Sequence, residues 1–349
     1  MKSSLAEFKE GLDNLKRYID GLNLEAKLLA ASFREDVSSK AHLILLDFQK
    51  HNNDYRLVKR RYDYASIIIS MYGYWERFIE ALVCDYVRLL NTIVPGYDSL
   101  PSAITENHLR LSVELMGRLD KTRYSKSIKL EAIISSLNSC INGGGKYKLV
   151  EEAFVYHTAN FRSDLVDQSF SRLGISSVSQ RSTQTCIFSE YLESRLQLEW
   201  VSAARPFSYL DDLVERRNEV AHGLPSELLS NELALEYIRF LEILGCALFE
   251  VIYSEALAIQ VKYKANLLGY PIAVYDNRIV CIKLQGTSVS LGDLLIAKTS
   301  SIALPYLGGE IIQIQENKKS MHHASDGATV GLEINFHAKD NQEFYLIST

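Results

Sequence analysis

The hydrophobic periodicity of this 349-residue chain changes near residue 265, and this change constrains the fold most strongly. Before that point, apolar residues recur every three or four positions, which is typical of helices. After it, short apolar stretches alternate with turn residues, which is typical of strands. We therefore predict a multidomain α plus β protein, with an all-helical bundle over residues 1–262 and a small closed β-barrel over residues 263–349.

The first helical segment carries a narrow apolar seam. Its members are Leu5, Phe8, Leu12, Leu15, Ile19 and Leu22. Such a seam can pack on its own domain or pair with a second chain. Packing on its own domain is favoured because the pattern fades after about three heptads and because Gly11 and Gly21 weaken an autonomous coiled coil.

The remaining helices follow from apolar periodicity and from breaks at glycine and proline. Residues 41–91 predict one or two long helices, with a wide stripe suited to a bundle centre. The stripe contains Tyr64, Ile67, Ile68, Met71, Trp75, Phe78, Ile79 and Leu82. Further helices are expected over residues 108–119, 127–140, 188–200, 207–222 and 231–259. Residues 143–146 and 176–182 are expected to be loops, and the former lack the rest of a phosphate-binding loop.

The strand-rich part begins between Val261 and Leu268. Strands are expected over residues 272–275 and 279–284, on either side of a tight turn at Asp276-Asn277. Others are expected over residues 293–297, 309–315, 329–336 and 343–347.

Composition narrows the functional classes. The net charge of −5 argues against broad electrostatic coating of nucleic acid but allows a local basic patch. The five cysteines have no CxxC spacing, so we expect buried free thiols and neither a metal nor another cofactor. No signal-peptide core or membrane span is apparent, which predicts a cytoplasmic protein without a membrane partner.

The segment that carries chemistry is the helix ending at Gly223. Arg217, Asn218 and His222 lie within six residues of one another. Arginine suits phosphate, histidine suits proton transfer near neutral pH, and asparagine can orient either group. Asn218 and His222 share a helix face, whereas Arg217 lies about 140° from His222. A second copy of the helix would make a complete site easier to build.

Spacing alone favours a solvated helix face with a terminal histidine, but a family resemblance changes this interpretation. Residues 217–223 (RNEVAHG) resemble the RNxxAHG form of the Arg-x(4–6)-His motif of HEPN-domain ribonucleases. Residues 74–79 resemble an early core helix of that family. Residues 160–166, continuing to 173–175, resemble a segment of its RiboL-PSP branch. The resemblance covers roughly residues 1–258.

The resemblance implies a metal-independent endoribonuclease in which the ribose 2′-hydroxyl attacks the adjacent phosphate. His222 would act as general acid or base, and Arg217 would stabilise the phosphate charge. Asn218 would orient the imidazole or the phosphate. Glu76 and Arg216 are second-tier candidates. Family members form dimers that bring two motifs together, so a homodimer acting on tRNA or rRNA is expected, as a toxin with an antitoxin or as an antiviral defence effector. The alternatives are a non-catalytic helical interaction protein and a nucleotide-binding regulator.

Other polar residues have less specific interpretations. Glu76 beside Trp75 also fits an ordinary surface charge. The run Lys59-Arg60-Arg61 fits a solvated helix face better than a phosphate contact. The remaining histidines have no ligand partners nearby in the sequence. They are the pair His322-His323 and the isolated His42, His51, His108, His157 and His337.

The C-terminal part carries a second resemblance. Residues 289–293, 310–315 and 324–332 resemble, in order, three segments of the second domain of translational GTPases such as elongation factor Tu. Any small barrel needs glycine corners of this kind, which is the alternative explanation. As a hypothesis, this barrel directs the nuclease to tRNA or the translation apparatus, or imitates a translation factor.

Overall fold

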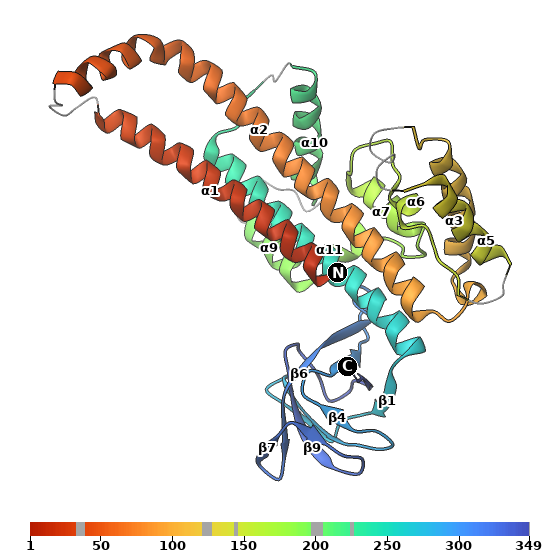
Figure 1. Cartoon of the computed structure of the whole chain (residues 1–349). Helices are drawn as coiled ribbons and strands as arrows, with labels where there is room; N and C mark the ends of the chain where they lie inside the picture. Colours follow the sequence, from red (N-terminus) through yellow and green to blue (C-terminus); the bar gives the residue numbers. More distant parts are fainter. Residues whose placement is uncertain (33–38, 121–127, 143–145, 197–204, 224–226, 349) are drawn as a thin grey trace. The chain divides into compact units, whose positions relative to one another are not determined.

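The structure is a computed structural model of the whole chain (Figure 1). It describes residues 1–32, 39–120, 128–142, 146–196, 205–223 and 227–348. The predicted glycine turn at 143–145, the end of the helix predicted to reach residue 200, and Pro225 lie outside the described residues. Two compact units emerge. The first contains Met1–Ala81, His157–Val166 and Ile187–Cys246, and the second contains Leu82–Tyr156, Asp167–Cys186 and Ala247–Thr349.

The first unit is built on two long helices that lie side by side, α1 (Lys2–Ser32) and α2 (Ser39–Ile93) (Figure 1). Phe8, Leu12, Leu15 and Ile19 are buried within the chain. The seam therefore packs on its own domain, as the periodicity favours. Region 41–91 forms one helix, and all eight residues of the predicted wide stripe are buried.

Glycine allows α1 to approach its neighbours closely. A Cβ on Gly11 would lie 2.6 Å from a ring carbon of Tyr74 on α2, and one on Gly245 would lie 2.4 Å from the ring of Phe8. The Phe8 ring also stacks on Phe78 at 4.4 Å between centroids. Real Cβ contacts are longer than this, so both glycines are required by packing.

Three further helices complete the first unit. They are α9 (Cys186–Leu196), α10 (Ser208–Ala221) and the first half of α11 (Asn231–Tyr263). Phe188 and Tyr191 on α9 meet Phe240 on α11 at about 6 Å between ring centroids. Lys16 on α1 pairs with Glu242 on α11 at 2.8 Å. These contacts fix α11 against both α9 and α1.

The helices of the second unit are shorter. They are η1 (Tyr97–Ser99), α3 (Ser102–Met116), α5 (Leu130–Ile141), α6 (Glu151–Val155), the end of α7 (Ser163–Ser171) and α8 (Val178–Ser182). The helix predicted from residue 108 begins six residues earlier, directly after Pro101, which suits the start of a helix. The serine-rich stretch predicted as a loop contains α8, because Val178, Ser179 and Ser182 are buried.

The chain changes to strands at β1 (Asn266–Gly269). The strands that follow are β2 (Ala273–Tyr275), β3 (Ile279–Lys283), β4 (Val289–Ser290), β5 (Leu294–Lys298), β6 (Tyr306–Glu316), β7 (Lys319–Met321), β8 (His323–Ala324), β9 (Thr329–Ile334) and β10 (Phe344–Ile347). The main antiparallel path runs β1-β10-β5-β6-β9-β3-β2. In the described residues this path does not close, so the strands form a half-barrel instead of the closed barrel expected.

The half-barrel depends on residues with positive φ. Asp276 (φ 51°) and Asn277 (φ 54°) form the predicted tight turn between β2 and β3. Gly292 (φ 86°) lies in the turn before β5. The buried carboxylate of Asp293 accepts a hydrogen bond from the backbone N–H of Ser290 at 2.8 Å and stabilises that turn.

Within the second unit, the half-barrel packs on α8 and on the end of α11. The Ser254 hydroxyl donates to the carbonyl of Tyr306 at 2.7 Å. Arg181 on α8 donates to the carbonyl of Ala303 at 3.0 Å and pairs with Glu255 at 2.6 Å. This half-buried arginine orients the connection between β5 and β6 relative to α11.

Within the described ranges, no helix has the length and apolar character that crossing a bilayer would need.

All five cysteines are free thiols, but only Cys140 and Cys246 are buried, and Cys186 is exposed. The expectation that all five are buried was wrong.

Candidate functional site

The Arg-Asn-His motif lies at the end of α10. Leu210, Leu213 and Val214 bury one face of this helix, and none of them lies in its last turn. His222 is the C-cap residue, and its N–H bonds the carbonyl of Asn218 at 3.0 Å. Gly223 follows with φ 77°, which ends the helix as the sequence predicts. The His222 side chain is exposed and can meet a ligand.

Arg217 is held against an aromatic ring. Its guanidinium carbon lies 5.3 Å from the ring centroid of Tyr72 on α2, within the range of a cation–π contact. Its Nη1 donates to Oδ1 of Asn218 at 3.4 Å. The guanidinium therefore has a defined position while part of it stays accessible.

Asn218 connects the motif to another segment. Its Oδ1 accepts a hydrogen bond from Nδ2 of Asn160 at 2.9 Å. This bond assigns the orientation of the Asn218 amide, so its N–H₂ group points away from Asn160. The structure thus places Arg217, Asn218 and Asn160 in contact.

Arg216 has a different environment from Arg217. Its Nε donates to Asp212 at 2.5 Å, and its Nη1 donates to the carbonyl of Glu227 at 3.1 Å. Tyr237 also donates to Asp212. Burial lowers the pKa of Arg216, but hydrogen bonds with Tyr64 and Asp212 outweigh burial and raise it. These contacts hold Arg216 within its own unit.

The segment 157–162 lies between α2 and α10. The Phe161 N–H donates to the hydroxyl of Tyr72 at 3.0 Å, and its carbonyl accepts from Nε1 of Trp75 at 2.9 Å. Arg162 pairs with Asp211 and Glu215 on α10, the latter at 2.5 Å. The same short segment therefore contacts both helices that carry candidate site residues.

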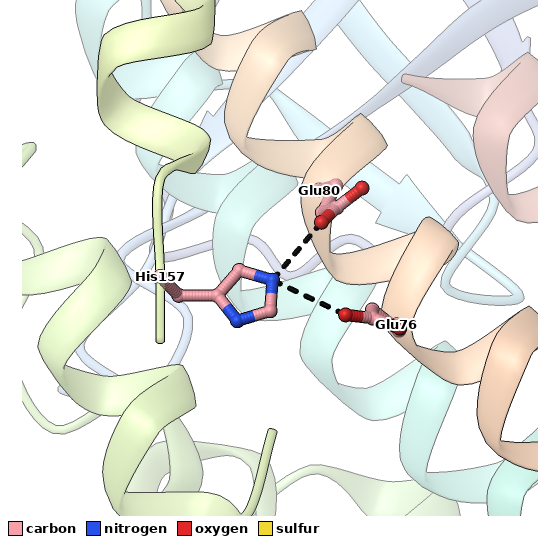
Figure 2. A group of neighbouring side chains, drawn as sticks. All are labelled: Glu76, Glu80 and His157. Carbon is pink, nitrogen blue, oxygen red and sulfur yellow. Dashed lines mark hydrogen bonds and ion pairs between the residues drawn. The ribbon is translucent and has the colours of Figure 1, made fainter. Parts of the chain in front are cut away.

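His157 at the start of this segment contacts two glutamates (Figure 2). Its Nε2 lies 3.0 Å from Oε1 of Glu80 and 3.3 Å from Oε1 of Glu76. Its Nδ1 lies 2.8 Å from the carbonyl of Ala159. The expectation that His157 is isolated was wrong, and Glu76 is more than a surface charge.

Sequence reasoning missed Glu80 and His157 as a pair. The spacing of Glu76 and Glu80 places both on one helix face, and that signal was present in the sequence. Nothing in the sequence indicated which distant residue would face them, because His157 lies 77 positions after Glu80.

The basic run on α2 does not form a uniform positive patch. Lys59 pairs with Asp63 at 2.9 Å and with Glu25 at 3.2 Å, whereas Arg60 and Arg61 are exposed. A groove of about 960 Å³ beside this run is lined by residues of both charges. A solvated helix face, the interpretation favoured from the sequence, agrees with these contacts.

Two other histidine positions have local structural roles. His108 is fully buried; its Nε2 accepts from the N–H of Val150 at 3.0 Å, and its ring stacks on Phe154. In the half-barrel, His323 Nδ1 lies 3.0 Å from the Ser290 hydroxyl.

A comparison with protein families agrees with the helical architecture. The family model described as RiboL-PSP-HEPN matches residues 36–254, which is more than half of the chain. The chain belongs to the RiboL-PSP-HEPN family. None of the curated proteins matches the chain.

Family membership connects the geometry to a class of function. HEPN domains are generally associated with ribonuclease or nucleotide-related activity. The matched region of this RiboL-PSP-HEPN protein includes Arg217, Asn218 and His222, and it also includes the glutamates that face His157. The half-barrel from residue 266 onward lies outside the match.

Proposed function

We propose that this HEPN protein is a metal-independent endoribonuclease. The single observation that carries the proposal is the exposed His222 at the end of α10, five residues after Arg217, whose guanidinium is held in a defined position. A histidine that served only packing would be buried, as His108 is. An exposed imidazole at a helix end is free to approach a ribose and its phosphate.

In the proposed reaction, the ribose 2′-hydroxyl loses its proton to a base and attacks the adjacent phosphorus. The bond from phosphorus to the 5′-oxygen breaks, which leaves a 2′,3′-cyclic phosphate and a 5′-hydroxyl. His222 serves as the general base or as the acid that protonates the leaving oxygen. Arg217 stabilises the charge on the pentacoordinate phosphate through its planar fork.

Asn218 and Asn160 support the position of Arg217 in this proposal. The side-chain oxygen Oδ1 of Asn218 accepts hydrogen bonds from both Asn160 and Arg217. An amide oxygen with two donors is fixed, so the guanidinium has fewer alternative positions. Asn218 thus acts as a positioning residue, and its own N–H₂ can donate to a phosphate.

We further propose that the active form is a homodimer with composite sites. Arg217 and His222 are five residues apart, so they diverge around α10. A second α10 opposite the first brings Arg217 of one chain near His222 of the other. A twofold dimer produces two such sites at once.

The RNA target is proposed from the C-terminal part. The turn at Gly292 and Asp293 and the strand β6 occupy the segments that resemble the second domain of translational GTPases. We propose that this half-barrel directs cleavage to tRNA or ribosomal RNA, in a toxin or antiviral defence effector that an antitoxin restrains. Cosedimentation of the full chain with ribosomes tests this part, and absence from the ribosomal fraction contradicts it.

The test of the activity is cleavage of total tRNA and rRNA by wild type, His222→Ala and Arg217→Ala, with and without EDTA. Wild type should cut in both conditions and leave cyclic phosphate ends, and both variants should fail. Circular dichroism must first show that the variants fold. If wild type is inert, or if the variants cut equally well, the alternative of a non-catalytic helical interaction protein is favoured.

A mixing experiment tests the composite site. His222→Ala and Arg217→Ala chains are unfolded together and refolded, so that half of the dimers contain one chain of each kind. Each mixed dimer has one intact composite site, so about a quarter of wild-type activity should return. If each site lay within one chain, mixing would restore nothing.

A further inference from the structure

Three metal-ligating side chains converge inside the first unit, apart from the Arg-Asn-His motif. The imidazole of His157 and the carboxylates of Glu76 and Glu80 each offer one ligand atom, and these atoms all lie within 4.8 Å of one another. We infer that these residues form a binding site for a divalent first-row transition-metal ion such as zinc. The inference does not depend on the proposed ribonuclease activity.

The hydrogen bonding of His157 supports a cation at this position. A carbonyl oxygen can only accept, so the contact with Ala159 at 2.8 Å assigns the ring proton to Nδ1. In the neutral ring, Nε2 then carries a lone pair that faces Glu80 at 3.0 Å and Glu76 at 3.3 Å. Three electron-rich atoms that face one point repel one another unless a metal ion or a second ring proton lies between them.

Two of the three distances between ligand atoms agree with a shared metal ion, and all three lie within 4.8 Å. Ligand atoms about 2.1 Å from zinc are about 3.0 Å apart at a 90° angle and about 3.4 Å apart at the tetrahedral angle. The two distances from Nε2 to carboxylate oxygens, 3.0 and 3.3 Å, fall within this interval. Metal-bound histidines also commonly donate their other ring N–H to a backbone carbonyl, as His157 does to Ala159.

The surroundings hold the ligands in place before any ion binds. Both glutamates lie on successive turns of α2 (Figure 2), and the adjoining face of this helix contains the fully buried Trp75 and Ile79. The Trp75 indole also donates to Phe161, which fixes the segment that carries His157. A rigid helix and an anchored segment keep the three ligand atoms together at little entropic cost on binding.

The position between the three ligand atoms is accessible to solvent on the side of the two carboxylates. The His157 side chain is only 5% exposed, whereas those of Glu76 and Glu80 are 26% and 22% exposed. An ion can therefore enter past the carboxylates and keep one or more water ligands. A nitrogen ligand with two carboxylates suits zinc or manganese better than magnesium, which prefers oxygen ligands.

The competing explanation is a second proton on His157, which would make an imidazolium paired with both glutamates. An ion pair and a metal site require the same three residues but differ in what they bind. Only the metal site binds an ion with one-to-one stoichiometry, and only a bound Co²⁺ ion gives a visible d–d absorption band that depends on these ligands.

The experiment uses the full chain, stripped with EDTA and dialysed, then titrated with Zn²⁺ and separately with Co²⁺. Wild type should bind one ion per chain and develop the Co²⁺ band. Glu80→Gln and His157→Gln should lose both signals. Asp85→Asn, another carboxylate on α2, and His337→Gln, an exposed histidine, should keep them.

Folding of each variant is checked by circular dichroism, and Glu76→Gln provides a second isosteric variant if His157→Gln fails to fold. Two outcomes would overturn the inference. One is the absence of a bound ion in wild type, which identifies the ion pair. The other is an ion that remains bound in Glu76→Gln and Glu80→Gln, which places the ion elsewhere.

Discussion

The end of α10 and the segment at residue 157 each present a histidine, but in opposite environments. His222 is exposed at a helix terminus, and the residues that define its motif are neighbours in the sequence. His157 is buried, and its partners come from a helix 77 positions away. An exposed histidine at a helix end can meet a ligand from solvent, whereas a histidine enclosed by carboxylates has its partners within the chain.

Replacing His222 should separate function from stability most clearly. His222→Ala is expected to reduce RNA cleavage by roughly 10²- to 10⁴-fold, the usual contribution of a general acid or base. Its thermal unfolding midpoint should stay at the wild-type value because the side chain is exposed. Cleavage rates and calorimetry check the two parts. A large drop in the midpoint would mean that His222 also supports the fold.

Replacing Trp75, in contrast to His222, should lower the stability of the protein, because Trp75 anchors the segment that carries His157. Trp75→Ala should destabilise the protein by about 3–5 kcal/mol through loss of core packing. Trp75→Phe keeps much of the packing but leaves the Phe161 carbonyl without its donor, so a loss of about 1–3 kcal/mol is expected. Urea unfolding measures both. Wild-type stability of Trp75→Phe would show that the hydrogen bond contributes nothing.

The adjacent arginines of α10 provide a matched pair. Arg216→Ala should cost about 1–3 kcal/mol, because it removes hydrogen bonds to Asp212 and Glu227. Arg217→Ala should cost less than about 1 kcal/mol, since it removes mainly a cation–π contact, but it should abolish cleavage. Equilibrium unfolding and RNA cleavage are measured on both variants. If Arg216→Ala lost activity without losing stability, the division of roles would be reversed.

His108 extends the comparison, because it is a buried histidine that contacts no carboxylate among the described residues. Burial lowers the pKa of His108 to about 4 from the ordinary 6.5. The unfolded chain therefore takes up a proton below pH 6.5 that the folded chain does not, so stability falls as the pH drops from 6.5 towards 4. His108→Gln should flatten this dependence by on the order of 1 kcal/mol per pH unit. Parallel stability curves for wild type and variant between pH 7 and pH 5 would contradict it.

The helices and strands were largely predictable because their signals are local. The stripe on α2, the end of α10 at Gly223 and the turn at Asp276 depend on neighbouring residues, and all three appear as expected. The start of α3 and the short α8 were missed, because burial by distant elements decides them. Closure of the half-barrel was also wrongly expected, since alternation shows which face is buried but not which strands pair.

The residues of the candidate sites also fall into two groups, those found from a local motif and those found only from the fold. Arg217, Asn218 and His222 were found because a motif places them within six residues. The partners of these residues, Tyr72 and Asn160, and the pairing of His157 with Glu76 and Glu80 required the fold. Contacts between residues far apart in the chain leave no periodicity in the sequence to detect.

The placement of two like charges on successive turns of α2 also affects the order in which the chain assembles. Glu76 and Glu80 repel each other on an isolated helix, and they leave the ribosome 77 residues before the histidine that faces Glu80. During synthesis this stretch of α2 is therefore a weak nascent helix. Its contact with His157 forms only after residue 157 emerges, when nearly half of the chain has been made, and the first unit is complete only after Cys246.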